Sequence, residues 1–168
     1  MLRRDLENIP EYQLPAGFSF CWFRPGDEET WVQIQTAADL YNKISRQLFD
    51  QEFADRALLP ERQFYVMEPL GRTIGTAAAW FKEIAGERIG RVHWVAVVPE
   101  FQKRGLGKAM MSFCCRRLKE LGHRQAFLST SSVRIPAIKL YLQFGFEPCT
   151  KSDQEEALWK QIRAQLSH

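Results

Sequence analysis

Apolar side chains recur along the chain at two spacings, and the changes between them predict an alternation of strands and helices. Alternate or continuous apolar positions predict strands over residues 18–23, 63–67, 72–82, 88–98 and 125–130, with a short last strand from Phe146. Apolar positions three and four apart predict a first helix, which begins within residues 27–30 and runs to Ala38. They predict further helices over roughly 39–57, 104–121, 134–144 and 154–166.

The order of these elements predicts a mixed α/β sheet. The strands between 63 and 98 follow one another through short turns, which favours antiparallel pairing. The helix over 104–121 then links strand 88–98 to strand 125–130, and such a crossover produces a parallel pair. Residues 88–98 are nearly continuous β-formers, as expected of a central strand covered on both faces. We therefore expect a mostly antiparallel sheet with one parallel pair, flanked by helices.

Size and composition are those of one globular domain. The chain has 168 residues, 45% of them hydrophobic and 26% charged, and no internal repeat or linker, so we expect a single domain over 1–168. The net charge of +3 is too small an excess for a dedicated nucleic-acid binder. No apolar run is long enough to span a bilayer, and no apolar segment follows the first arginines as in a secretory signal. A cytoplasmic protein is the expectation.

The cysteines provide no pattern for a metal site or a disulfide framework. None belongs to a C-x-x-C pair, and no histidine lies at ligand spacing from two of them. Cys21, Cys114, Cys115 and Cys149 are therefore interpreted as small hydrophobic residues in a reducing compartment, and no metal cofactor is expected.

The segment that leaves strand 88–98 carries the clearest chemical signal. Residues 102–108 read Gln-Lys-Arg-Gly-Leu-Gly-Lys at the start of a predicted helix. Unpaired N–H groups at a helix N-terminus bind anions, and glycines let the backbone approach a phosphate. The spacing fits neither the P-loop nor the Rossmann fingerprint. A phosphate or pyrophosphate site is one interpretation, and a tight turn with solvated cations is the other.

Two motifs in the predicted order resemble the GNAT superfamily of acyl-CoA-dependent N-acyltransferases. Residues 102–107 resemble that family's Q/R-x-x-G-x-G/A loop, and residues 95–101 match the end of its fourth strand. Residues 134–141 and 145–148 resemble its x-x-x-A-x-x-L-Y-x-x-x-G-F-x-P segment. The resemblance is specific over roughly 63–149, whereas 1–60 fit only in element order. It implies the GNAT fold and acetyl-CoA as co-substrate.

The resemblance also implies where acetyl-CoA would bind. The pantetheine arm would pair with the backbone of Ala96, Val97 and Val98, and the N–H of Val97 would polarise the thioester carbonyl. Arg134 stands where many relatives have asparagine, so the usual amide contact is lost, although a guanidinium can still pair with the cofactor. The pyrophosphate would lie on the loop and its cations: Gln102, Lys103, Arg104, Gly105, Leu106, Gly107 and Lys108.

Two catalytic residues are expected, one for each proton. Tyr141 matches the family's general acid for the departing CoA thiolate, with a packing role as the alternative. Some relatives carry a basic glutamate on the fourth strand, but the matching position here is Arg91. His93 lies two residues on and should share that face, so it could relay the proton, or only pack. Ser129 is a weaker candidate, and ordered water alone is another.

The acceptor site is the least defined part of the sequence. In this fold the early helices would help to build it. Their acids can attract a cationic amine or can be solvated caps and helix faces: Asp27, Glu28, Glu29, Asp50, Glu52 and Asp55.

These features predict an acetyl-CoA-dependent N-acetyltransferase that acts by direct attack of a primary amine of a small molecule or a protein. A non-catalytic acyl-CoA-binding sensor or interaction module is the alternative, supported by the missing carboxylate base. An RNA-binding protein ranks third, because aromatic and basic residues are not interleaved on the basic helix. The expected partners are acyl-CoA and an amine, without nucleic acid or membrane, and a homodimer is an expectation from the family alone.

Overall fold

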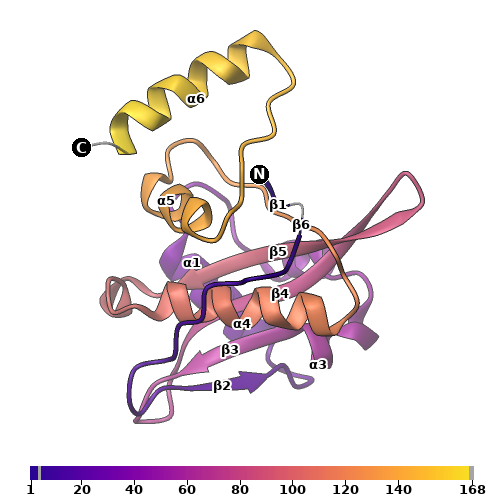
Figure 1. Cartoon of the computed structure of the whole chain (residues 1–168). Coiled ribbons are helices and arrows are strands. Elements are labelled where there is room, and N and C mark those ends of the chain that lie inside the picture. Colours follow the sequence, from indigo (N-terminus) through magenta and orange to yellow (C-terminus); the bar gives the residue numbers. More distant parts are fainter. Residues whose placement is uncertain (4, 167–168) are drawn as a thin grey trace.

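Within residues 1–3 and 5–166, which the computed structural model describes, six strands form one sheet with helices on both faces (Figure 1). The strands are β1 (Leu2–Arg3), β2 (Ser19–Trp22), β3 (Gln63–Met67), β4 (Thr73–Ile84), β5 (Glu87–Val97) and β6 (Ala126–Phe127). The helices are α1 (Glu28–Ala38), α2 (Arg46–Glu52), α3 (Leu59–Arg62), α4 (Leu106–Glu120), α5 (Ile135–Gln143) and α6 (Asp153–Leu166).

The sheet topology confirms the predicted fold class. The strand order is β1-β6-β5-β4-β3-β2, and neighbours from β2 to β5 pair antiparallel. β5 and β6 are the parallel pair, joined through α4 as the strand–helix–strand order predicted.

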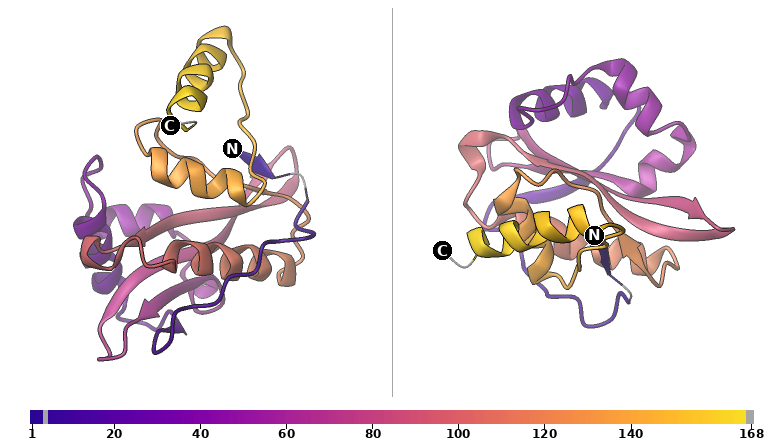
Figure 2. Two further views of the ribbon diagram at one scale, coloured as in Figure 1. Left: turned by 60° about the vertical axis from the view of Figure 1, so that its left-hand side comes forward. Right: turned by 90° about the horizontal axis from the view of Figure 1, so that it is seen from above.

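Two helical layers enclose the core. In the right-hand view of Figure 2, residues 28–62 lie on one side of the sheet and α4 on the other. α4 packs against β4 and β5 through a fully buried stripe that includes Leu106, Met110 and Leu118. Small side chains on β4 allow close approach, since the thiol of Cys114 lies 3.5 Å from the carbonyl of Ala78.

The predicted helix over 39–57 is wrong at its first part. Residues 39–45 form a loop, and α2 covers only Arg46–Glu52. Asp39 ends α1 because its carboxylate accepts hydrogen bonds from the backbone N–H groups of Tyr41 and Asn42, which holds the chain in a turn. Ser45 then starts α2 as its N-cap, accepting a 3.1 Å hydrogen bond from the N–H of Leu48. This loop carries one wall of the site described below.

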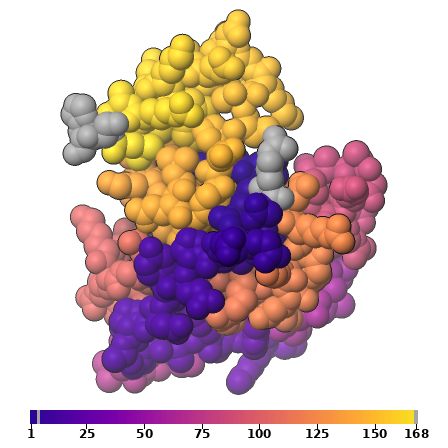
Figure 3. All heavy atoms as spheres, viewed as in Figure 1, coloured from indigo at the N-terminus to yellow at the C-terminus, as the bar shows by residue number. Residues whose placement is uncertain are grey.

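The N-terminal segment completes the sheet edge, which the sequence pattern did not indicate. β1 pairs with β6, and Leu2 also bridges to Glu147, so the expected last strand from Phe146 is reduced to an isolated bridge. The chain then crosses the α4 side of the molecule, visible as an indigo band in Figure 3. There the Ser112 hydroxyl donates to the carbonyl of Pro10 and accepts from the N–H of Tyr12.

Candidate active site

The sheet opens between β5 and β6. Their pairing is recorded for Gly90 with Ala126 and Arg91 with Phe127, and beyond these residues the two strands diverge. The second half of β5 therefore has one edge paired with β4 and the other edge facing an opening.

A β-bulge in β5 lies at the start of this opening. The register with β4 shifts so that Ala77 faces two residues, Trp94 and Val95, because Thr76 pairs with Ala96 and Ala78 with His93. Trp94 has φ +48°, an uncommon conformation for a bulky side chain. The side-chain amide of Gln35 on α1 donates a 2.7 Å hydrogen bond to the Trp94 carbonyl and holds the bulge in place.

The backbone beyond the bulge offers hydrogen-bonding groups to the opening. The N–H of Val98 donates to the carbonyl of Ile74 on β4. Since successive residues of a strand point their backbone groups to opposite edges, the N–H of Val97 points away from β4. The Val97 carbonyl already accepts a 2.9 Å hydrogen bond from the side chain of Gln102. The edge that the sequence assigned to a pantetheine arm is thus exposed to the opening.

The turn from β5 to α4 contains the loop that the sequence assigned to an anion. Lys103 and Gly105 both have positive φ, +60° and +82°, and Gly105 is the N-cap of α4. Within the described ranges, the backbone N–H groups from Lys103 to Gly107 have no hydrogen-bond partner. A Cβ on Gly107 would lie 3.3 Å from Leu140, so the helix backbone is closely covered there. Unpaired amides at a helix N-terminus suit a phosphate.

The cations of this turn take different positions. Lys103 and Arg104 are exposed, and Arg104 donates to the carbonyl of Glu100 while its guanidinium lies over the ring of Phe101. Lys108 is half-buried, with its ammonium 5.0 Å from the centre of the Tyr12 ring. All three cations belong to the turn that carries the unpaired amides or to the first turn of α4.

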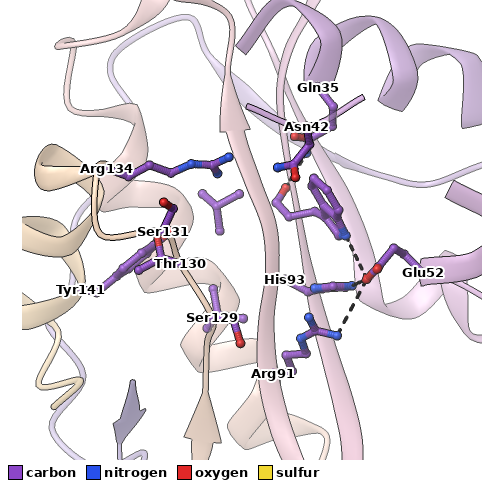
Figure 4. Close-up of a pocket in the computed structure, with 13 residues that line it drawn as sticks. Gln35, Asn42, Glu52, Arg91, His93, Ser129, Thr130, Ser131, Arg134 and Tyr141 are labelled. Atoms are coloured by element: carbon purple, nitrogen blue, oxygen red, sulfur yellow. Dashed lines mark hydrogen bonds and ion pairs between the residues drawn. The ribbon is translucent and has the colours of Figure 1, made fainter. Parts of the chain in front are cut away.

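A cavity of about 300 Å³ lies at the opening, where side chains from both helical layers meet (Figure 4). A second hollow of about 420 Å³ continues it to Gln102, and the two share Gln35, Val95, Arg134 and Tyr141. The first cavity is lined by Gln35, Asn42, Glu52, Arg91, Val92, His93, Trp94, Val95, Ser129, Thr130, Ser131, Arg134 and Tyr141.

Tyr141 of α5 lines both hollows and is 9% exposed. Burial raises the pKa of its phenol to about 12, so the hydroxyl stays protonated at neutral pH. The hydroxyl has no hydrogen-bond partner among the residues that the structure describes, which leaves its proton to a ligand.

Glu52, at the end of α2, brings a carboxylate to the cavity. Its Oε2 accepts a 3.1 Å hydrogen bond from the indole Nε1 of Trp94 and lies 2.9 Å from Nε2 of His93. The His93 ring is turned away from ideal hydrogen-bond geometry at this distance. The guanidinium of Arg91 lies further from this carboxylate, with Nη1 3.9 Å from the same oxygen (Figure 4).

These contacts set the protonation states of Glu52 and His93. The contact with His93, followed by the hydrogen bond from Trp94, lowers the pKa of Glu52 to about 2, although partial burial opposes the change. Burial lowers the pKa of His93, which is 4% exposed, despite the neighbouring carboxylate. At neutral pH Glu52 is therefore ionised and His93 is neutral.

Arg134 bridges the two walls of the second hollow. Its Nη2 donates a 2.7 Å hydrogen bond to Oδ2 of Asp39 in the loop after α1. Burial alone would raise the pKa of Asp39, but hydrogen bonds from Asn42, the N–H of Tyr41 and Arg134 outweigh it and lower the pKa. The guanidinium therefore ties α5 to the 39–45 loop beside the predicted cofactor path.

Most acids predicted on the acceptor side have protein partners. Glu28 and Asp50 pair with Arg46 and Arg56, and Glu29 pairs with Arg46. Asp27 accepts the N–H of Arg24 in the turn before α1. Glu52 is the member of this set that lines the cavity beside β5.

Sequence reasoning did not select Glu52 or Gln35 as site residues. Both lie in the region that matched the family only in element order, and neither belongs to a motif. The one signal for Glu52 was its place among the acids near the end of a predicted helix.

Comparison with known proteins identifies the family. The profile of the Acetyltransferase (GNAT) family matches residues 16–146. Mycothiol acetyltransferase of Streptomyces coelicolor is 32% identical over 151 residues, covering 86% of this chain and 48% of that protein. Mycothiol acetyltransferase of Streptomyces bingchenggensis is 34% identical over 143 residues, covering 83% and 46%. The chain thus spans about half the length of these curated relatives.

Solved structures share the fold. A GCN5-related N-acetyltransferase from Sphaerobacter thermophilus superposes with a TM-score of 0.71 at 23% identity, covering 87% of this chain and 46% of that one. The ribosomal-protein-S18-alanine N-acetyltransferase from Escherichia coli gives 0.65 at 20% identity, covering 79% of each. These superpositions show the fold, and the profile match over residues 16–146 shows the family. The chain belongs to the GNAT acetyltransferase family.

Two further findings bear on the expected partners. Within the described ranges, no three His, Cys, Asp or Glu side chains are arranged to hold a metal ion. No helix in this part of the chain combines the length and the apolar character that crossing a bilayer requires.

Proposed function

We propose that this chain transfers the acetyl group of acetyl-CoA to a primary amine. The observation that carries the proposal is that one opening unites the free edge of β5, the Tyr141 hydroxyl and the Glu52 carboxylate, and reaches Gln102, next to the unpaired amides from Lys103 to Gly107. Family membership and the names of the curated relatives support acetyl transfer.

The chain's groups fit acetyl-CoA along the opening. The pyrophosphate would accept hydrogen bonds from the amides between Lys103 and Gly107, with the nearby cations as countercharge. The pantetheine amides would pair with the edge formed by Val95, Ala96 and Val97. The thioester would then lie where the second hollow meets the cavity, so that the N–H of Val97 can stabilise the carbonyl oxygen as it gains negative charge.

Glu52 and His93 would remove the proton that the acceptor must lose. An alkylammonium has a pKa of about 10, so it must give up a proton before its nitrogen can attack the carbonyl carbon. Neutral His93 can accept that proton directly or through water, and the ionised Glu52, held by Trp94, lies beside it and stabilises the imidazolium that forms. The carboxylate that the sequence lacked on β5 would thus come from α2.

Tyr141 would supply the second proton. The new C–N bond forms as the C–S bond breaks, and the electron pair leaves on sulfur. The Tyr141 hydroxyl is protonated and unpartnered, so it can donate to this sulfur as charge develops there. The burial that raises the pKa of Tyr141 also disfavours a bare thiolate, so the pKa of the CoA thiol would be raised in the same environment.

Release of free CoA thiol tests the proposal. The protein is incubated with acetyl-CoA and a panel of primary amines, and the acetylated amine is identified by mass. We expect thiol release that depends on both substrates. CoA binding without acetylation of any amine, including peptide N-termini, would contradict acetyl transfer and favour a CoA-binding sensor.

A further inference from the structure

Arg91 carries a guanidinium in the cavity that has no hydrogen-bond acceptor. Its side chain is 27% exposed, and its Nε is buried without a partner. No N–H donor of Arg91 forms a hydrogen bond within 1–3 and 5–166. Arg62 also has a buried Nε without a partner, but its Nη1 donates to the carbonyl of Ala79. Arg91 has no such contact and lines the cavity, so a ligand there can supply acceptors for its donors.

The charges around Arg91 leave it only partly neutralised. The nearest carboxylate, Glu52, is 3.9 Å away and is already engaged by Trp94 and His93. The other cation of the cavity, Arg134, is neutralised by Asp39 at 2.7 Å. The cavity therefore presents one negative group and one positive group side by side.

We propose that Arg91 binds an anionic group of the acceptor, so that the acceptor is a small primary amine carrying a carboxylate or a phosphate. This inference rests on the proposed acetyl transfer. The ammonium of such a molecule would face Glu52 and its anionic group would face Arg91, so that each charged end meets a side chain of opposite charge. The planar fork of a guanidinium matches both carboxylate and phosphate oxygens.

The cavity supports a small acceptor of this kind. Its volume of about 300 Å³ must also hold the acetyl end of the cofactor. The hydroxyl-bearing residues Ser129, Thr130 and Ser131 line the wall on the β6 side and can hydrogen-bond the rest of the molecule.

Three amines with the same two-carbon spacer test the inference: ethanolamine, β-alanine and O-phosphoethanolamine. We expect kcat/KM to be about 10- to 100-fold higher for at least one anionic amine than for ethanolamine, as a charge-assisted contact would give. The two anionic arms distinguish carboxylate from phosphate. Equal rates for all three, or acetylation of neutral amines alone, would overturn the inference while leaving acetyl transfer intact. No acetylation of any amine would instead refute the proposed function on which it rests.

The variant Arg91→Gln should remove the preference. KM for the anionic amine should rise by about 10- to 100-fold relative to KM for ethanolamine, with KM for acetyl-CoA unchanged. Arg88→Gln is the matched control, since Arg88 lies on the same strand, is 63% exposed and pairs with Glu83 outside the cavity. Arg91→Lys, which keeps the charge, covers the case in which Arg91→Gln does not fold and should retain part of the preference. A preference that survives in Arg91→Gln, or is equally lost in Arg88→Gln, would refute the role of Arg91.

Discussion

Replacing Glu52 with glutamine should separate acid–base chemistry from binding. The amide keeps the size of the side chain and can still accept the hydrogen bond from Trp94, but it carries no charge to stabilise a protonated His93. We expect kcat to fall about 100- to 1,000-fold, the usual size of the effect of losing general acid–base catalysis. KM for acetyl-CoA should stay unchanged, because Glu52 lies away from the hollow that leads to Gln102.

The pH profile should change as well. In the unaltered protein the rate should fall where His93 becomes protonated, below pH 6.5 because its pKa is lowered. In Glu52→Gln the protonated form of His93 is no longer stabilised by a carboxylate, so more of the amine must lose its proton to solvent, and the rate should keep rising with pH toward the amine's own pKa of about 10.

The substitution Glu52→Gln should also lower the free energy of unfolding, so the assay must be run where the variant is still folded. A carboxyl pKa of about 2 in place of 4.5 corresponds to about 3 kcal/mol at 1.36 kcal/mol per pH unit. With 29% of the side chain exposed, solvent screening reduces this to ~1–2 kcal/mol. Because the pKa is lowered on folding, this stabilisation is complete above pH 4.5 and is lost as the pH falls toward about 2.

The assay is thiol release from pH 5 to 10 at saturating acetyl-CoA, run well below the unfolding temperature of each variant. Glu29→Gln is the matched control, since Glu29 is 62% exposed and contacts Arg46 outside the cavity. A folded Glu52→Gln protein with unaltered kcat and pH profile would refute the proton route through Glu52 and assign it to solvent.

Three further predictions concern the cofactor side. Tyr141→Phe should lower kcat about 100-fold while leaving the calorimetric affinity for CoA nearly unchanged, and an unchanged rate would exclude Tyr141 as the acid. Gly107→Glu should abolish CoA binding by placing a carboxylate among the unpaired amides. Gly107→Ala should still bind CoA, because its Cβ would contact only a side chain, at 3.3 Å. Equal binding of CoA by both variants would show that the pyrophosphate does not bind at this turn. Arg134→Ala should raise KM for acetyl-CoA and speed hydrogen exchange in residues 39–45, and Asp39→Asn should have the same effects. The double variant should show no larger effect than either single variant, since both substitutions remove the same hydrogen bond.

The segments that could be predicted were those whose own residues determine their structure. The strand over 88–98 and the turn after it were found because a continuous β-forming run meets a helix start marked by two glycines. Helix α4 followed from its apolar stripe. These are local signals, and the family motifs coincide with them.

Long-range contacts explain what the sequence did not indicate. Glu52 reaches the cavity because Asp39 and Ser45 break the early helix and redirect α2, and the apolar spacing of 39–57 hid that break. β1 joins the sheet through residues more than a hundred positions away, on β6 and at Glu147. No hydrophobic periodicity within the first residues could predict that pairing.

The bulge at Trp94 was equally hidden, because no glycine marks it, and a positive φ at an aromatic residue costs of order 1–3 kcal/mol. The surroundings of Trp94 offset that cost. Gln35 holds its carbonyl, Glu52 accepts its indole N–H, and Trp31 packs edge-on against it with ring centres 5.2 Å apart. The contacts that keep the edge of β5 open are therefore the same ones that place the Glu52 carboxylate beside it. The opening of the sheet and the position of the Glu52 carboxylate from α2 are in this way coupled through one strained residue, which is why neither could be inferred from its own stretch of sequence.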